Sequence, residues 1–151
     1  MPAVASGSPM PLFDRLAASG EAQLSGVEAL RESVARDLGR LLNTRSHLTF
    51  EAFAASEGTV LDYGLPDFSE RSLHSGPDRE AIAAAIKHAI AMYEPRLVNV
   101  SVDFVFPADH SPHAVLTIGG ELRSGTHVSH VAFELAADGH VAAGERATEQ
   151  A

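Results

Sequence analysis

Residues 81–107 read AIAAAIKHAIAMYEPRLVNVSVDFVFP, and the spacing of their apolar side chains changes partway along. Up to Tyr93 the apolar residues recur at three- and four-residue steps, which predicts an amphipathic helix. From Val98 onward they fall at every second position, which predicts a half-buried strand. The residues expected to face the core are Ile82, Ile86, Ile90 and Tyr93 on the helix and Val98, Val100, Val102, Phe104 and Phe106 on the strand.

Pro95 separates these two elements and ends the helix, because its ring pushes Glu94 out of the helical backbone conformation. Glu94 and Arg96 therefore flank a rigid residue, and we expect both side chains to be held outward on a backbone that cannot easily rearrange. Such rigidity lowers the entropic cost of docking. The alternative is a local, solvated ion pair that contributes about 0–1 kcal/mol.

Upstream, a second apolar stripe predicts a helix from about Val27 to Leu42. Ser25 and Glu28 have the spacing of a capping box at the start of that helix. The side chains expected to be buried on it are Val27, Leu30, Val34, Leu38 and Leu41.

The two predicted helices are joined by residues without a regular period. Residues 43–53 predict a loop with room for one helical turn. Residues 56–77 are rich in Gly, Pro, Ser and Asp, and a loop this long inside a compact domain is functional or packs on itself. Pro77 suits the first turn of the later helix, because its fixed backbone angle fits there and its missing amide is not needed.

Downstream, short apolar runs alternate with turn residues. Turns are expected at 107–112, 123–126 and 138–139, and they separate strands near 114–122, 127–135 and Val141. Helices followed by strands predict an α+β domain, with N-terminal helices packed on one face of a three- to four-stranded antiparallel meander. We expect one domain over residues 10–141, with disordered ends at 1–9 and 142–151. The core positions expected on the later strands are Ala114, Leu116, Ile118, Leu122, Val131, Phe133 and Leu135.

Composition narrows the classes of function. Acidic residues outnumber basic ones by 20 to 11 among 151 residues, and a net charge of −9 argues against a nucleic-acid partner. The absence of cysteine is compatible with a reducing cytoplasm. The start of the sequence lacks signal-peptide features, and no apolar run is long enough for a spanning helix, so we expect no direct membrane insertion.

Eight histidines raise the question of a metal site. His127 and His130 are three residues apart on a predicted strand, so their side chains point to opposite faces and cannot hold one ion together. No helical pair has the spacing of zinc ligands. We therefore expect no metal site.

Four short motifs follow one another along the chain, each occurring once. They are Pro11–Leu16 (PLFDRL), Leu41–Arg45 (LLNTR), Val60–Phe68 (VLDYGLPDF) and Tyr93–Leu97 (YEPRL). In this order the chain resembles the TssE family of type VI secretion baseplate subunits, which is related to the wedge and lysozyme-related proteins of contractile phage tails. The chain departs from the family pattern at Asp62, where Asn is expected, and after Arg45, where phage relatives often have Trp or Gly.

The resemblance implies a structural protein of the cytoplasmic baseplate, docked at the inner membrane through other subunits. It implies neither an enzymatic activity nor a cofactor. It implies binding to the wedge subunits TssF and TssG and contact with the first layer of the contractile sheath, formed by TssB and TssC. The residues that it marks as partner-binding are Glu94, Pro95, Arg96, Asn43, Arg45, Asp62, Tyr63 and Asp67.

Several of these residues also have a purely structural interpretation. Asn43 suits a left-handed helix cap and Arg45 complements the helix dipole, and this interpretation comes first for both. Asp62, Tyr63 and Asp67 belong either to a docking surface or to a loop pinned by its own aromatic residues. A sheet edge near the last strands could accept a strand from a sheath subunit, or could be protected by histidines or the tail.

Two other functions remain alternatives. A lysozyme-like glycoside hydrolase needs two carboxyl groups across a sugar cleft, and the sequence singles out no pair among its carboxylates. The other alternative is a stand-alone adaptor domain bound to an unrelated partner. The carboxylates considered for hydrolysis are Glu51, Glu57, Asp62, Asp67 and Glu94.

Overall fold

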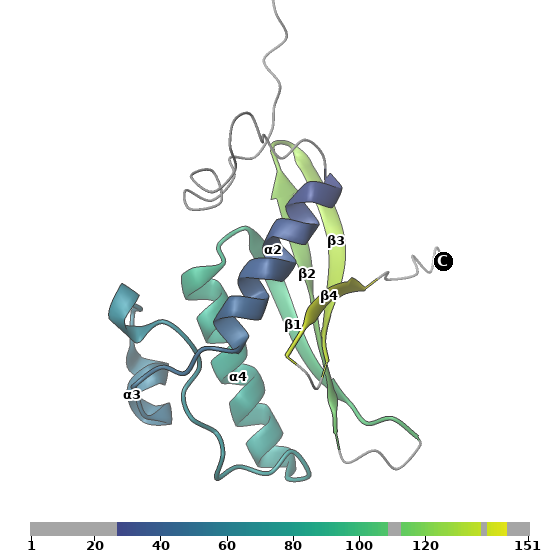
Figure 1. Cartoon of the computed structure of the whole chain (residues 1–151). Helices are drawn as coiled ribbons and strands as arrows, with labels where there is room; N and C mark the ends of the chain where they lie inside the picture. Colours follow the sequence, from purple (N-terminus) through teal and green to yellow (C-terminus); the bar gives the residue numbers. More distant parts are fainter. Residues whose placement is uncertain (1–26, 109–112, 137–138, 145–151) are drawn as a thin grey trace, which may run out of the picture.

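The computed structural model describes residues 27–108, 113–136 and 139–144, and Figure 1 shows helices followed by a sheet. The helical elements are α2 (Val27–Leu42), the short α3 (Phe50–Ala55), the 3₁₀ turn η1 (Val60–Asp62) and α4 (Gly76–Tyr93). The strands are β1 (Leu97–Val105), β2 (Val115–Ser124), β3 (His127–Leu135) and β4 (Val141–Gly144).

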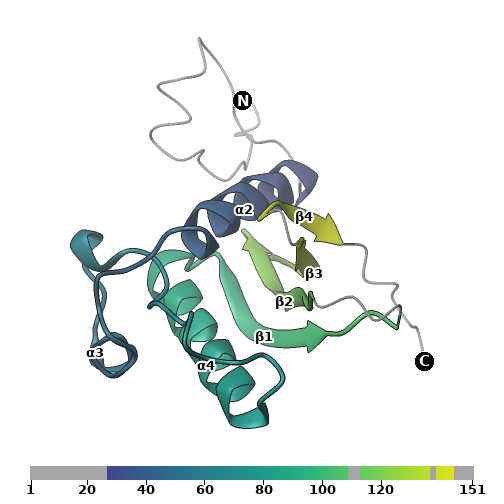
Figure 2. The ribbon, with the colours of Figure 1, turned by 60° about the horizontal axis from the view of Figure 1, so that its bottom comes forward.

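The sheet is an antiparallel meander in the order β1-β2-β3-β4. Helices α2 and α4 lie against it, α4 beside β1 and α2 beside β3 and β4 (Figure 2). This confirms the predicted α+β class, with helices preceding a four-stranded sheet. No helix within the described parts of the chain is long and apolar enough to cross a bilayer.

Helix α2 has the predicted bounds, and its stripe is buried except at Val27. Leu30, Val34, Leu38 and Leu41 are each at most 1% exposed, whereas Val27 is 38% exposed. Val27 was expected in the core, but it begins the helix ahead of the turns that pack on the sheet. Ser25 of the expected capping box lies outside the described residues.

Helix α4 also follows the prediction. Its N-cap is Ser75, whose hydroxyl accepts the amide of Asp78 at 3.4 Å, and Pro77 lies in the first turn. The three isoleucines are buried and Tyr93 is partly buried. Glu94 has φ −130° and ψ 69°, so the helix ends before Pro95 as expected.

Strand β1 departs from the predicted alternation because it contains a β-bulge. Leu97 and Val102 are both buried although they are five residues apart, and the pairing register with β2 shifts between Val98 and Ser101. Asn99 lies in this shift with φ 53°. The expected inward face is confirmed in the middle of the strand, where Val102 is buried and the partly buried Val100 and Phe104 pack against the core. It is wrong at Val98, which is only partly buried while its neighbour Leu97 is buried, and at Phe106, which is 38% exposed.

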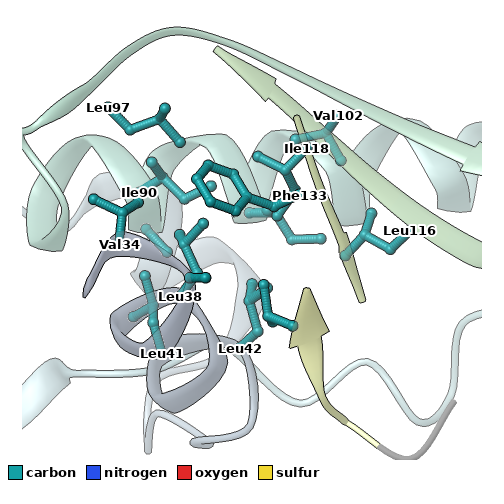
Figure 3. Packing of buried hydrophobic residues seen from close by; sticks show 14 of the residues in the cluster. Val34, Leu38, Leu41, Leu42, Ile90, Leu97, Val102, Leu116, Ile118 and Phe133 are labelled. Carbon is teal, nitrogen blue, oxygen red and sulfur yellow. The ribbon is translucent and has the colours of Figure 1, made fainter. Parts of the chain in front are cut away.

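The remaining strands supply the core that was expected, with two exceptions: Leu135 is partly buried, and Ala114 is partly buried and precedes β2. Phe133 of β3, 1% exposed, lies among Leu38, Ile90 and Ile118 (Figure 3). Each such side chain contributes roughly 1.5–3 kcal/mol on full burial. Strand β4 continues to Gly144, so the expectation that disorder begins at residue 142 is wrong for residues 142–144. The other residues expected to be disordered, 1–9 and 145–151, lie outside the described parts of the chain.

Candidate partner-binding site

Three of the four sequence motifs meet beside the C-terminal ends of α2 and α4; the fourth, Pro11–Leu16, lies outside the described residues. The segment after α2 and the loop after η1 form a short parallel bridge, in which Ser46 N donates to Leu65 O at 2.8 Å and Leu65 N donates to Thr44 O at 2.9 Å. Gly64 makes this approach possible. Its φ is +117°, and a Cβ on it would lie 2.6 Å from Thr44 O.

An aromatic pair joins the loop to the end of α4. The rings of Tyr63 and Tyr93 meet edge to face, with centroids 5.1 Å apart, and the Tyr93 hydroxyl donates to Thr59 O at 2.9 Å. Burial raises the pKa of Tyr63 above its ordinary value, with the charge of Asp37 as a further cause. The pKa of Tyr93 is also raised, mainly by desolvation. The ring of Tyr63 and the backbone of Thr59 are therefore anchored to the end of α4.

Arg96 is the centre of a polar network that reaches back to α2. Its Nε and Nη2 donate to the two carboxylate oxygens of Glu94 at 2.7 and 2.6 Å. Nη2 also donates to Asp37 Oδ2 at 2.5 Å, and Nη1 donates to Ser33 Oγ at 3.1 Å. Hydrogen bonds to Glu94 hold the pKa of Arg96 above its ordinary value. The network ties the α4–β1 junction to the middle of α2.

The expectation that Glu94 and Arg96 are held outward is wrong. Glu94 is 3% exposed, and the Arg96 side chain keeps 23% exposure while lying along α2. A carboxylate so buried needs a compensating charge, and the nearest guanidinium supplies it within the same chain. The pair is therefore an internal, bidentate one rather than a solvated surface pair.

What remains accessible here is a hollow of about 300 Å³ beside the pair. Pro95 is exposed on its rim, and Tyr63 and Arg40 also line it. Arg40 and Arg96 both contact Asp37, at 3.2 and 2.5 Å, so the wall of the hollow carries both signs of charge. The full lining is Asp37, Arg40, Leu41, Tyr63, Tyr93, Glu94, Pro95 and Arg96.

Asn43 caps α2 with its side chain. Its Nδ2 donates to Gly39 O and to Gly139 O, both at 2.7 Å, so the amide also holds the turn between β3 and β4. The left-handed cap expected at this position is wrong, because Asn99 is the one non-glycine residue with positive φ in the described ranges. The structural interpretation of Asn43 nevertheless stands, through a different contact.

Arg45 satisfies the end of α2 and covers an aromatic ring. Its Nη1 donates to Leu42 O at 3.1 Å, and its guanidinium carbon lies 4.7 Å from the centre of the Phe68 ring. Arg45 and Asn43 border a second hollow of about 300 Å³ whose walls include Phe68, Leu73 and Phe104. Arg45 remains exposed.

Each of the two aspartates of the loop motif accepts hydrogen bonds from residues two or three positions away in the chain. Asp62 Oδ2 accepts the Thr59 amide and hydroxyl at 3.2 and 2.8 Å. Asp67 is exposed, and its Oδ1 accepts the Ser69 amide at 3.0 Å; hydrogen bonds from Ser69 lower the pKa of this carboxyl below its usual value. Both residues shape the loop surface.

A comparison with known protein families identifies the family to which this chain belongs. The family of baseplate wedge protein gp25 matches residues 28–127, more than half of the 151-residue chain, and these residues include all three converging motifs. The chain belongs to the gp25-like baseplate wedge family. No curated protein and no solved structure matches the chain.

The gp25-like family is a structural one. In this member, Asp62, Asp67 and Glu94, three of the carboxylates considered for hydrolysis, accept hydrogen bonds from their own chain. Among the described residues no three His, Asp or Glu side chains are grouped to hold a metal ion. His127 and His130 are both exposed on β3.

Sequence reasoning missed several residues that lie around the three converged motifs. Ser33 and Asp37 stand next to the apolar stripe of α2, and Ser33 is buried at 2% exposure. A serine at a buried helix position was the available signal for a polar partner from elsewhere. Val60 and Leu61 were noted within the loop, but the sequence does not reveal that both are largely exposed.

Proposed function

We propose that this gp25-like wedge protein is the TssE subunit of a type VI secretion baseplate. It binds the wedge subunits TssF and TssG and links them to the first layer of the sheath, built from TssB and TssC. Its site of action is the cytoplasmic baseplate, which other subunits dock at the inner membrane. The observation that carries this proposal is the match of residues 28–127 to a baseplate wedge family, together with the four ordered motifs.

The geometry favours a docking role for the converged motifs. Pro95, Tyr63 and Arg45 are held by the bridge, the tyrosine pair and the Arg96 network, so their surface is ordered before any partner arrives. Preordered surfaces lose less conformational entropy on binding. Glu94 and Arg96 contribute chiefly by fixing the junction that presents Pro95, and Arg96 also offers its remaining exposed edge.

The sheet edge formed by β4 and the first half of β3, opposite β1, is suited to contact with the sheath. Strand β4 pairs with Ala132–Leu135 of β3, and no described residue pairs with the outer side of 127–131. An unpaired edge of this kind can accept a strand from another chain. We therefore assign sheath contact to this edge and wedge contact to the converged motifs.

The proposal is tested by co-expression with tagged TssF and TssG from the same genome. The wild-type chain is expected to co-purify with them, and a strain lacking it is expected to form no fluorescent TssB sheaths until it is restored. Failure to co-purify, with normal sheaths in the deletion strain, would refute the assignment.

A further inference from the structure

Val60 and Leu61 form an exposed apolar pair on η1, which we term the knuckle. Their exposed fractions are 92% and 84%, whereas no other large hydrophobic residue among the described ones exceeds 53%. Single exposed apolar residues are common on protein surfaces. Two adjacent branched side chains on one turn are a more specific feature, because together they leave more apolar surface in water than a single residue does.

The backbone of the knuckle is fixed from several directions. Asp62 N donates to Thr59 O at 3.0 Å, and the Asp62 carboxylate accepts the Thr59 amide in return. The Tyr93 hydroxyl holds the same Thr59 carbonyl, and a ring nitrogen of His47 lies 3.2 Å from Leu61 O. An exposed apolar pair on an anchored turn loses little conformational entropy on binding, which is typical of an interface anchor.

Charge identifies the kind of partner. Residues 56–63, SEGTVLDY, contain Glu57 and Asp62 but no Lys or Arg, and the whole chain carries −9. A second copy of this chain or an anionic membrane surface would be repelled. A protein pocket with an apolar floor and a basic rim is complementary in both respects.

We propose that Val60 and Leu61 are the apolar anchor by which this chain enters a pocket on a wedge subunit, and that Lys or Arg side chains border that pocket. This inference rests on the proposed baseplate function. It adds a named pair of residues and the chemistry of the surface that receives them.

The experiment measures the affinity of purified chain for the co-purified wedge subunits. The double variant Val60→Thr, Leu61→Asn keeps side-chain shape while removing apolar character, and it is expected to bind about 30-fold more weakly or worse, the loss typical of a hot spot. The matched control is Val105→Thr, on β1 and 53% exposed, which is expected to bind like the wild type. Both variants are expected to unfold at the wild-type temperature, because the replaced side chains are exposed.

A charge comparison tests the basic rim. Leu61→Lys is expected to weaken binding more than Leu61→Glu, since a lysine would meet like charges. The opposite order would overturn the inferred rim. Knuckle-dependent self-association in sedimentation, or knuckle-dependent flotation with vesicles of phosphatidylethanolamine and phosphatidylglycerol, would overturn the choice of partner.

The outcomes separate the two proposals. Wild-type binding that is unchanged in the double variant would overturn the inference about the knuckle and leave the proposed function standing. Absence of binding by the wild-type chain would overturn the proposed function, and the knuckle inference with it.

Discussion

The two carboxylate oxygens of Glu94 are held by Arg96, its neighbour across Pro95, at 2.7 and 2.6 Å. Since Glu94 is 3% exposed, its charge is compensated inside the domain, and the same guanidinium extends to Asp37 on α2. The Glu-Pro-Arg motif therefore works first as an internal brace. It fixes the angle at which the chain leaves α4 and enters the sheet.

Removing Arg96 should destabilise the isolated protein. Arg96→Met leaves the buried Glu94 carboxylate without its partner, and we expect the free energy of unfolding to fall by about 3–5 kcal/mol in denaturant titrations. Lys87→Met, which removes an exposed positive charge from α4, should change it by about 0.5 kcal/mol at most. The combination of Glu94→Gln with Arg96→Met should cost less than the sum of the single variants. Additive costs would show that the two residues do not interact.

Gly64→Ala should disrupt the contact between two of the motifs. The backbone conformation costs about 1–3 kcal/mol for a residue with a side chain, and the contact of the new Cβ with Thr44 O adds a similar amount. Gly76→Ala is the control, because a Cβ there meets no atom closer than 4.0 Å, the Arg79 Nη2. Thermal unfolding of both variants measures the difference. Equal melting temperatures would contradict the close approach.

Asn43 should be sensitive to the chemistry of its amide rather than to its size. Asn43→Ala removes two donated hydrogen bonds and should cost about 1–2 kcal/mol. Asn43→Asp keeps the shape but places a carboxylate against two carbonyl oxygens, so it should cost at least as much at pH 7. An aspartate variant as stable as the wild type would mean that Asn43 does not donate to Gly39 and Gly139.

The two tyrosines should titrate above their ordinary range. The chain has two Tyr and no Trp, so near-ultraviolet absorbance reports Tyr63 and Tyr93 alone. Burial raises both pKa values in the folded state above 10.0. The associated stability is present below about pH 10, the unfolded value, and is lost as the pH rises through the folded values. A native titration midpoint equal to that in denaturant would contradict the packing of this pair.

The sequence was sufficient to predict the helices, because their apolar stripes and the residues that end them lie close together in the chain. The stripe of α2 gave its bounds, and the isoleucine stripe followed by Pro95 gave the end of α4. The register of β1 was not predictable, because the bulge at Asn99 depends on β2. There Gly120 leaves room for Leu97, since a Cβ on it would lie 2.8 Å from Leu97 Cδ1.

The sequence marked the motifs but did not show how their side chains are oriented. Three of the four motifs lie together, and the inward direction of Arg96 depends on Ser33 and Asp37, which lie 63 and 59 positions earlier in the chain. No local pattern around Arg96 encodes such distant partners. The exposure of Val60 and Leu61 likewise depends on how the long loop folds back on α4.

Hydrogen–deuterium exchange of the chain, alone and bound to TssF and TssG, tests most directly whether the converged motifs form the wedge-binding face. We predict that binding slows exchange at residues 59–65 and 92–97 and leaves β2 unchanged. Protection confined to other parts of the chain, with these two segments exchanging as they do in the free protein, would contradict the account.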